Sequence, residues 1–192
     1  SIREADMVVP DGMPIVWALR WKGYQKAERI YGPDLTLRLC QEASKKKWKV
    51  GFLGGSSGQT ERLKKALEDK NPGIDIVCTI DTPTRPIEEK ENKKIIQKIN
   101  NSKSDILFVG LGCPLQELWM AENSKKLKPM VLVGVGAAFN FISGDIKQAP
   151  RWMQGLGLEW LFRITQEPVR LIHRYARINI ILLKYLIGIL YR

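Results

Sequence analysis

The chain has 192 residues, a formal net charge of +11 at pH 7 and a hydrophobic fraction of 44%, which is ordinary for a globular protein. This length fits one domain with a small appendage. The positive charge favours nucleic acid, anionic lipid or a phosphorylated substrate as partner. A single histidine excludes a multi-histidine metal site, and three cysteines without metal or CxxC spacing indicate a reduced, cytoplasmic protein.

Apolar runs alternate with amphipathic stretches through most of the chain. The apolar runs predict strands, and the stretches between them predict helices. Near-continuous apolar strands separated by helices are typical of a mostly parallel sheet with helices on both faces. We therefore expect an α/β, Rossmann-like core over residues 1–143. The predicted strands are residues 49–53, 74–80, 105–109 and 130–135, and the predicted helices are residues 15–21, 33–43, 59–69, 87–100 and 115–127.

Residues 144–192 predict a helical appendage without strands. Its helices, residues 157–166 and 169–191, are separated at Glu167-Pro168, because the residue before a proline avoids the helical conformation. The last helix has basic residues at three- or four-residue steps opposite an apolar stripe. Its uninterrupted apolar run is too short to span a bilayer, which needs about 20 residues. We expect this helix to lie on a membrane surface; packing on the domain or on another subunit is the alternative.

Two predicted strands run into glycine-rich loops that precede helices, LGGSSGQ at residues 53–59 and GLGCPLQE at residues 110–117. At such junctions backbone N–H groups and the helix dipole favour an anion, and glycine lets a diphosphate approach. We therefore name Gly54, Gly55 and Gly112 as candidate substrate-binding residues. Neither loop is a complete dinucleotide fingerprint or a Walker motif, so a tight turn without a ligand is the alternative.

Further polar residues are candidates for chemistry. Asp11, in a Pro-Asp-Gly turn, could act as a general base toward a hydroxyl, or could serve the turn alone. Gln116, just inside a predicted helix, could contact a sugar or a base. Because the sequence has no DxD motif and no close set of acidic or histidine ligands, a nucleotide-sugar enzyme of this sequence would stabilise its leaving group with arginines rather than a metal. The arginines near the C-terminus are Arg151, Arg163, Arg170, Arg174 and Arg177.

Five segments stand out between about Ala5 and Arg177: VVPDGMPIVWA, AERIYGPDL, DILFVGLGCPLQELWM, VGVGAAFNFISG and APRWMQGLGLEWLFRITQEPVRL. Together, and in this order, they resemble the WecG/TagA/CpsF family of bacterial glycosyltransferases. The resemblance implies a membrane-associated, inverting enzyme that needs neither a metal nor a cofactor. It implies transfer of N-acetylmannosamine or its uronic acid from a UDP-sugar donor to a polyprenyl-diphosphate-linked N-acetylglucosamine acceptor, in cell-surface polysaccharide or teichoic acid synthesis.

The resemblance also implies roles for single residues. Asp11 becomes the base that deprotonates the acceptor hydroxyl, and Gln116 becomes a substrate contact. The family's third arginine corresponds to a histidine with an arginine beside it, so either side chain could make that phosphate contact. The residues that would hold the UDP diphosphate are Arg163, Arg170 and His173 or Arg174.

The resemblance places the protein at the inner face of the bacterial cell membrane, without a nucleic-acid partner, and leaves open whether subunits pair as a homo-oligomer. The sequence begins without methionine and lacks the family's segment before the Pro-Asp-Gly turn, so we expect it to begin inside a larger domain. Two other hypotheses stay open. One is an NAD-dependent oxidoreductase that uses residues 54–58 and Asp81; the other is a non-enzymatic basic module that binds nucleic acid or anionic membrane.

Overall fold

The computed structural model describes residues 4–83, 85–128, 130–169 and 171. The chain divides into two compact units. Unit 1 comprises Ser1–Val8 and Tyr31–Ile146, and unit 2 comprises Val9–Ile30 and Lys147–Arg192. The sequence places a boundary at residue 143, close to the start of the second stretch of unit 2. It gives no sign that the stretch before Tyr31 belongs to the same unit as the C-terminal residues.

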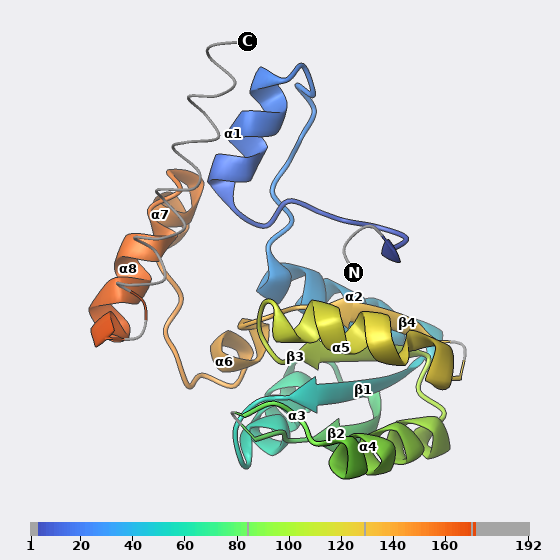
Figure 1. Cartoon of the computed structure of the whole chain (residues 1–192). Coiled ribbons are helices and arrows are strands. Elements are labelled where there is room, and N and C mark those ends of the chain that lie inside the picture. The colour runs from blue at the N-terminus through green and yellow to red at the C-terminus, as the bar shows by residue number, and fades with distance from the viewer. Residues whose placement is uncertain (1–3, 84, 129, 170, 172–192) are drawn as a thin grey trace. The chain divides into compact units, whose positions relative to one another are not determined.

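Unit 1 is an α/β sandwich around a parallel sheet, as predicted (Figure 1). In the described residues the sheet has four strands in the order β2-β1-β3-β4, and every neighbouring pair is parallel. The strands are β1 (Lys49–Gly54), β2 (Asp75–Ile80), β3 (Ile106–Gly110) and β4 (Val131–Gly134). The helices of this unit are α2 (Gly32–Lys46), α3 (Gln59–Lys70), α4 (Glu89–Ser102), α5 (Leu115–Asn123), the short 3-10 helix η2 (Ser124–Lys126) and α6 (Ala138–Ile142).

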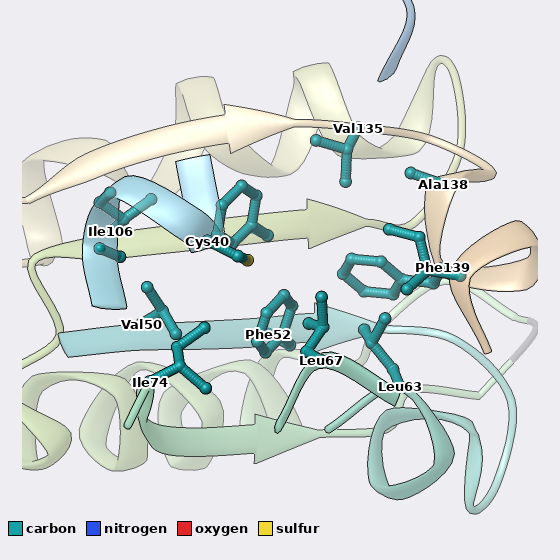
Figure 2. Close-up of a cluster of buried hydrophobic side chains, with 13 residues drawn as sticks. Cys40, Val50, Phe52, Leu63, Leu67, Ile74, Ile106, Val135, Ala138 and Phe139 are labelled. Atoms are coloured by element: carbon teal, nitrogen blue, oxygen red, sulfur yellow. The ribbon is translucent and has the colours of Figure 1, made fainter. Parts of the chain in front are cut away.

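The central strands are apolar at almost every position because both faces of the sheet are covered. Alternate residues of β1 and β3 point to opposite faces, so each strand contributes to two separate cores. On one face α2, α3 and α6 pack on Phe52 and Phe108. On the other face α4 and α5 pack on Leu53, Leu107 and Val109. The first core includes stacked rings of Phe52 and Phe108, whose centroids are 5.2 Å apart, and the side chains shown in Figure 2.

Unit 2 is helical in its described residues. It consists of α1 (Met13–Trp21), α7 (Arg151–Gly155) and α8 (Glu159–Gln166) with their connections. The turn between α7 and α8 contacts α1 so closely that a Cβ on Gly157 would lie 2.8 Å from the Trp17 ring and 3.1 Å from Met13. Glycine at position 157, with a φ of 70°, therefore allows two stretches that are far apart in the sequence to pack closely against each other.

No helix in the described part of the chain is long and apolar enough to cross a bilayer. The predicted membrane-surface helix, residues 169–191, falls almost entirely outside the described residues.

The ends of β1 and β3 meet at a pair of glycines. Gly54 and Gly110 are register partners, and a Cβ on Gly54 would lie 2.6 Å from the carbonyl carbon of Gly110. Gly54 has a φ of 123°, a backbone conformation that residues with a side chain rarely adopt. A Cβ on Gly110 would in turn lie 2.6 Å from the Phe139 ring. Both loops of the candidate site therefore begin from backbone that only glycine allows.

We expect the substitution Gly54→Ala to lower the free energy of unfolding by more than about 2 kcal/mol, because its methyl group would collide with backbone rather than with a movable side chain. Urea denaturation of the full chain measures this change. The control is Gly144→Ala, since Gly144 also has a positive φ, 83°, but no atom within 4 Å of the added Cβ. The control should cost only about 1 kcal/mol, and equal costs would contradict the steric explanation.

Candidate functional site

Polar residues of unit 1 gather where β1, β3 and β4 end, at the edge where parallel α/β sheets bind ligands. The loop after β1 is held by Asp81, which follows β2. Its carboxylate accepts hydrogen bonds from the backbone N–H groups of Gly58, at 2.6 Å, and Thr60, at 3.0 Å, and from the Thr60 hydroxyl. Asp81 thus occupies the anion position at the start of α3. Asp81 therefore already serves to hold this loop, which weighs against the role that the oxidoreductase hypothesis gives it.

Gln59 braces the same loop from inside the protein. Its Oε1 accepts a hydrogen bond from the Ser56 N–H group, and a Cβ on Gly55 would lie 2.4 Å from that oxygen. Its Nε2 donates to the side chains of Asn140 and Asp145. The buried Gln59 amide therefore ties the glycine loop to α6 and to the end of unit 1.

Asp145 is the centre of this brace. Arg62 donates to both of its carboxylate oxygens, from Nε at 3.0 Å and from Nη2 at 3.1 Å, and the Ser143 hydroxyl donates at 2.8 Å. The hydrogen bonds from Arg62, followed by those from Gln59 and Ser143, hold the pKa of Asp145 below its usual value. A paired arginine and carboxylate in two-point contact give the strongest geometry that such an ion pair adopts.

Gln116 organises the loops after β3 and β4. The residue is only 7% exposed, and its Oε1 accepts a hydrogen bond of 2.9 Å from the Gly136 N–H group. Its Nε2 donates to Oε1 of Glu117 at 2.8 Å. Gly112 lies one turn before it, with φ of 79° and nothing within 4 Å of where a Cβ would be. Gln116 therefore fixes the turn at Gly136, while the backbone at Gly112 has open space beside it.

Glu117 is a residue that the sequence analysis did not identify. Its second oxygen, Oε2, is buried, and no hydrogen bond to it is found within the described part of the chain. A buried acceptor in this position is normally satisfied by water or a ligand donor. Its place directly after Gln116 was the only signal in the sequence.

The candidate residues of unit 2 are joined by Arg29, which the sequence analysis also missed. Its Nε donates to the backbone carbonyl of Asp11, and its Nη2 lies 3.7 Å from the Asp11 carboxylate. The same Nη2 donates to Oε2 of Glu159 at 2.7 Å. Arg29 and Glu159 have side chains that are 16% and 15% exposed, whereas the Asp11 side chain is 69% exposed.

This arrangement leaves the Asp11 carboxylate accessible on a turn that is firmly attached to α8. Glu159 lies in the first turn of α8, where the helix dipole stabilises a negative charge. Arg163 lies one helical turn further along, on the same side of the helix. Unit 2 therefore brings together the turn of Asp11 and the helix that carries Arg163. Arg170, His173 and Arg174 lie outside the described residues.

No group of three histidine, cysteine, aspartate or glutamate side chains that could hold a metal ion occurs within the residues that the structure describes.

We expect Asp145→Asn to flatten the acid dependence of stability. Because the pKa of Asp145 is lower in the folded state than in the unfolded state, Asp145 stabilises the fold fully above the ordinary carboxyl pKa. This contribution is lost as the pH falls through the lowered pKa. Unfolding free energies measured from about pH 6 to pH 3 should fall less steeply in the variant than in the wild type.

The control for this experiment is Glu42→Gln. The pKa of Glu42 is also lowered, by a hydrogen bond from Lys45, but this pair is on the surface of α2 with side chains 46% and 60% exposed. Exposed pairs contribute little to stability, so the control should keep the wild-type acid slope. If the pH dependence of the unfolding free energy were the same in Asp145→Asn as in the wild type, the contacts of the Asp145 carboxylate would not stabilise the fold.

Comparison with known proteins identifies the family of the chain. Residues 1–191 match the Glycosyl transferase WecG/TagA/CpsF family. A protein of Bacillus spizizenii named N-acetylglucosaminyldiphosphoundecaprenol N-acetyl-beta-D-mannosaminyltransferase is 31% identical over 169 residues, which are 88% of this chain and 64% of the relative. The Bacillus subtilis protein of the same name is 27% identical over the same shares. The chain thus spans 64% of the length of these relatives, and it belongs to the WecG/TagA/CpsF family of glycosyltransferases.

Proposed function

We propose that the protein transfers N-acetylmannosamine, or its uronic acid, from a UDP-sugar to a polyprenyl-diphosphate-linked N-acetylglucosamine. The observation that carries this proposal is the family match over residues 1–191. The relatives' names specify an acceptor of this kind and the transfer of N-acetylmannosamine. The products of such a reaction enter cell-surface polysaccharide or teichoic acid.

The proposed reaction is a single displacement at the anomeric carbon of the donor sugar, with inversion. Asp11 accepts the proton of the acceptor hydroxyl, and the oxygen forms a bond to the anomeric carbon. The bond between this carbon and the diphosphate breaks on the opposite side, and UDP leaves with the electron pair. The exposure of the Asp11 carboxylate supports this role, since a general base must reach a hydroxyl of a bound substrate.

Arginines stabilise the departing diphosphate in this proposal. Of the residues proposed to hold the diphosphate, Arg163 lies within the part of the chain that the structure describes. Arg170 with His173 or Arg174 would complete the group. Guanidinium groups bind phosphate oxygens in two-point contacts and stay charged at every physiological pH. These side chains would therefore stabilise the negative charge that develops on the leaving group, without a divalent ion. Gln116, Gly112, Gly54 and Gly55, all in unit 1, are proposed as further substrate-binding residues.

We further propose that the protein acts at the inner surface of the cell membrane. Unit 2 contains 12 of the 31 lysines and arginines but only 4 of the 20 acidic residues. Its described part also exposes Trp21, Tyr24 and Trp152 at 51%, 65% and 63%. Tryptophan, tyrosine and cationic side chains are the groups that favour the headgroup region of an anionic bilayer.

The test of the proposal is release of UDP from UDP-N-acetylmannosamine in EDTA, with and without the lipid-linked acceptor. Acceptor-dependent release would support the reaction and its independence from metal. Binding of NAD without binding of UDP would instead favour the oxidoreductase hypothesis. Salt-sensitive binding of nucleic acid without UDP binding would favour the binding-module hypothesis.

Replacing Asp11 by asparagine should lower kcat by at least about 100-fold, because the amide cannot accept the proton of the acceptor hydroxyl. The affinity for UDP should stay unchanged, which calorimetry can measure in parallel with the transfer assay. Asp6→Asn is the control, since Asp6 is also an exposed aspartate near the N-terminus and should tolerate the change. A fully active Asp11→Asn variant would refute the assignment of the base.

Replacing Arg163 by alanine should weaken UDP binding by about 10- to 100-fold, through loss of charge-assisted hydrogen bonds to the diphosphate. Arg163→Lys should recover only part of this loss, because lysine keeps the charge but not the planar fork. The exposed Arg38 of α2 provides the control, and Arg38→Ala should bind UDP as the wild type does. Equal UDP affinity in all three variants would remove Arg163 from the site.

A further inference from the structure

Unit 2 contains a pocket that no step of the proposed reaction uses. Its volume is about 630 Å³, and it is lined by Pro10, by Leu19 of α1 and by residues 23–28. The lining is largely apolar. This volume is within the range of about 300–1,000 Å³ that is usual for small-molecule sites, and the pocket is open to solvent, since five of its eight lining residues are exposed.

The pocket is built by a segment that turns back after α1. The N–H group of Tyr24 donates to the Leu19 carbonyl, and Nε of Arg20 donates to the Ala27 carbonyl at 2.9 Å. The N–H group of Ile30 then donates to the carbonyl of Pro10 at 2.9 Å. The wall is therefore fixed by backbone hydrogen bonds at both ends, so a ligand would not have to order it.

The position of the pocket relates it to the proposed base. Pro10 lines the pocket and directly precedes Asp11 in the chain. The pocket therefore lies next to the turn that carries the proposed base.

The surroundings of the pocket suit an amphiphile with an anionic head. Lys26 and Glu28 both lie in its lining, and the exposed Lys22 on the same segment leaves the positive charges in excess. Trp21, 51% exposed, and Tyr24, 65% exposed, stand beside them. Apolar walls next to cations and exposed aromatic rings match a hydrocarbon chain attached to a phosphate group.

We infer that this pocket binds the first isoprenoid units of the lipid-linked acceptor, with the acceptor's diphosphate near Lys26. This inference rests on the proposed function. An apolar cavity of about 150 Å³ accommodates benzene, so a pocket of about 630 Å³ has room for several five-carbon units. Holding the chain here would place the acceptor's sugar, which is linked to the same diphosphate, close to Asp11.

The test compares two acceptors that differ only in their chain. Both carry N-acetylglucosamine diphosphate, one on a farnesyl chain and the other on an ethyl group. For the wild type we expect kcat/KM to be about 100-fold higher with the farnesyl acceptor, because only this chain buries apolar surface in the pocket. Leu19→Gln and Ala27→Phe, which make the pocket polar or fill it, should each reduce this preference to about tenfold or less.

These two variants should keep the wild-type kcat/KM for the ethyl acceptor, a result that damage to the fold would not give. The control is Ile15→Gln, since Ile15 is 52% exposed on the same helix and does not line the pocket. It should retain the full preference for farnesyl. An undiminished preference in both pocket variants, or an equal loss of activity with both acceptors, would overturn the inference.

Calorimetric titration with farnesyl diphosphate separates this inference from the proposed function. If the wild type transfers no sugar but binds farnesyl diphosphate, and Leu19→Gln weakens this binding at least tenfold, the pocket assignment stands and the proposed reaction fails. If transfer occurs but farnesyl diphosphate binds equally to the wild type and both pocket variants, the reaction stands and the pocket assignment fails. Equally tight binding of dodecyl phosphate would show a general hydrocarbon site and would refute the isoprenoid assignment.

Discussion

The close approach of β1 and β3 at their carboxyl ends is the constraint on which the arrangement of unit 1 depends. β1 can come this near to β3 only because Gly54 has no side chain, since a Cβ there would meet the Gly110 backbone. Gly110 must lack a side chain for another reason, because a Cβ there would meet the Phe139 ring. Their contact directs both following loops to the same edge of the sheet. Phe139 of α6 then packs over Gly110 and completes the core on that face. Packing and site geometry are therefore set by the same two residues.

The polar groups at this edge are mostly engaged with one another. Asp81 neutralises the start of α3, Gln59 spans from the glycine loop to Asp145, and Gln116 holds the turn at Gly136. Such a network lowers the cost of ordering the loops when a ligand arrives. It also means that these side chains would position backbone N–H groups rather than change partners, so that a substrate meets a surface that is already formed.

The sequence predicted the parallel α/β core well because its central strands, β1 and β3, are buried on both faces and therefore read as continuous apolar runs. It predicted neither α6 nor α7, since helices of five residues are too short to show a helical period. Arg29 could not be found from the sequence because its importance comes from a contact with Glu159, 130 residues away. Gln116 was correctly placed at a helix start, but its bond to Gly136 depends on how β3 and β4 align. The roles assigned to Asp11, Arg163 and the residues beyond Val169 stay predictions.

The composition of unit 2 from two separate stretches has a consequence for how the protein can be divided. The chain passes between the units after Val8, after Ile30 and after Ile146, so no single cut isolates either one. A chain shortened at Ile146 would retain α1 but lose the α7–α8 turn at Gly157 that covers Trp17 and Met13. Arg29 would keep its charge without Glu159. Such a shortened chain would expose the apolar surface of α1 and would leave the Arg29 cation without its partner. Exposed apolar surface favours association between molecules, so the activity of the shortened chain would not be comparable with that of the intact protein.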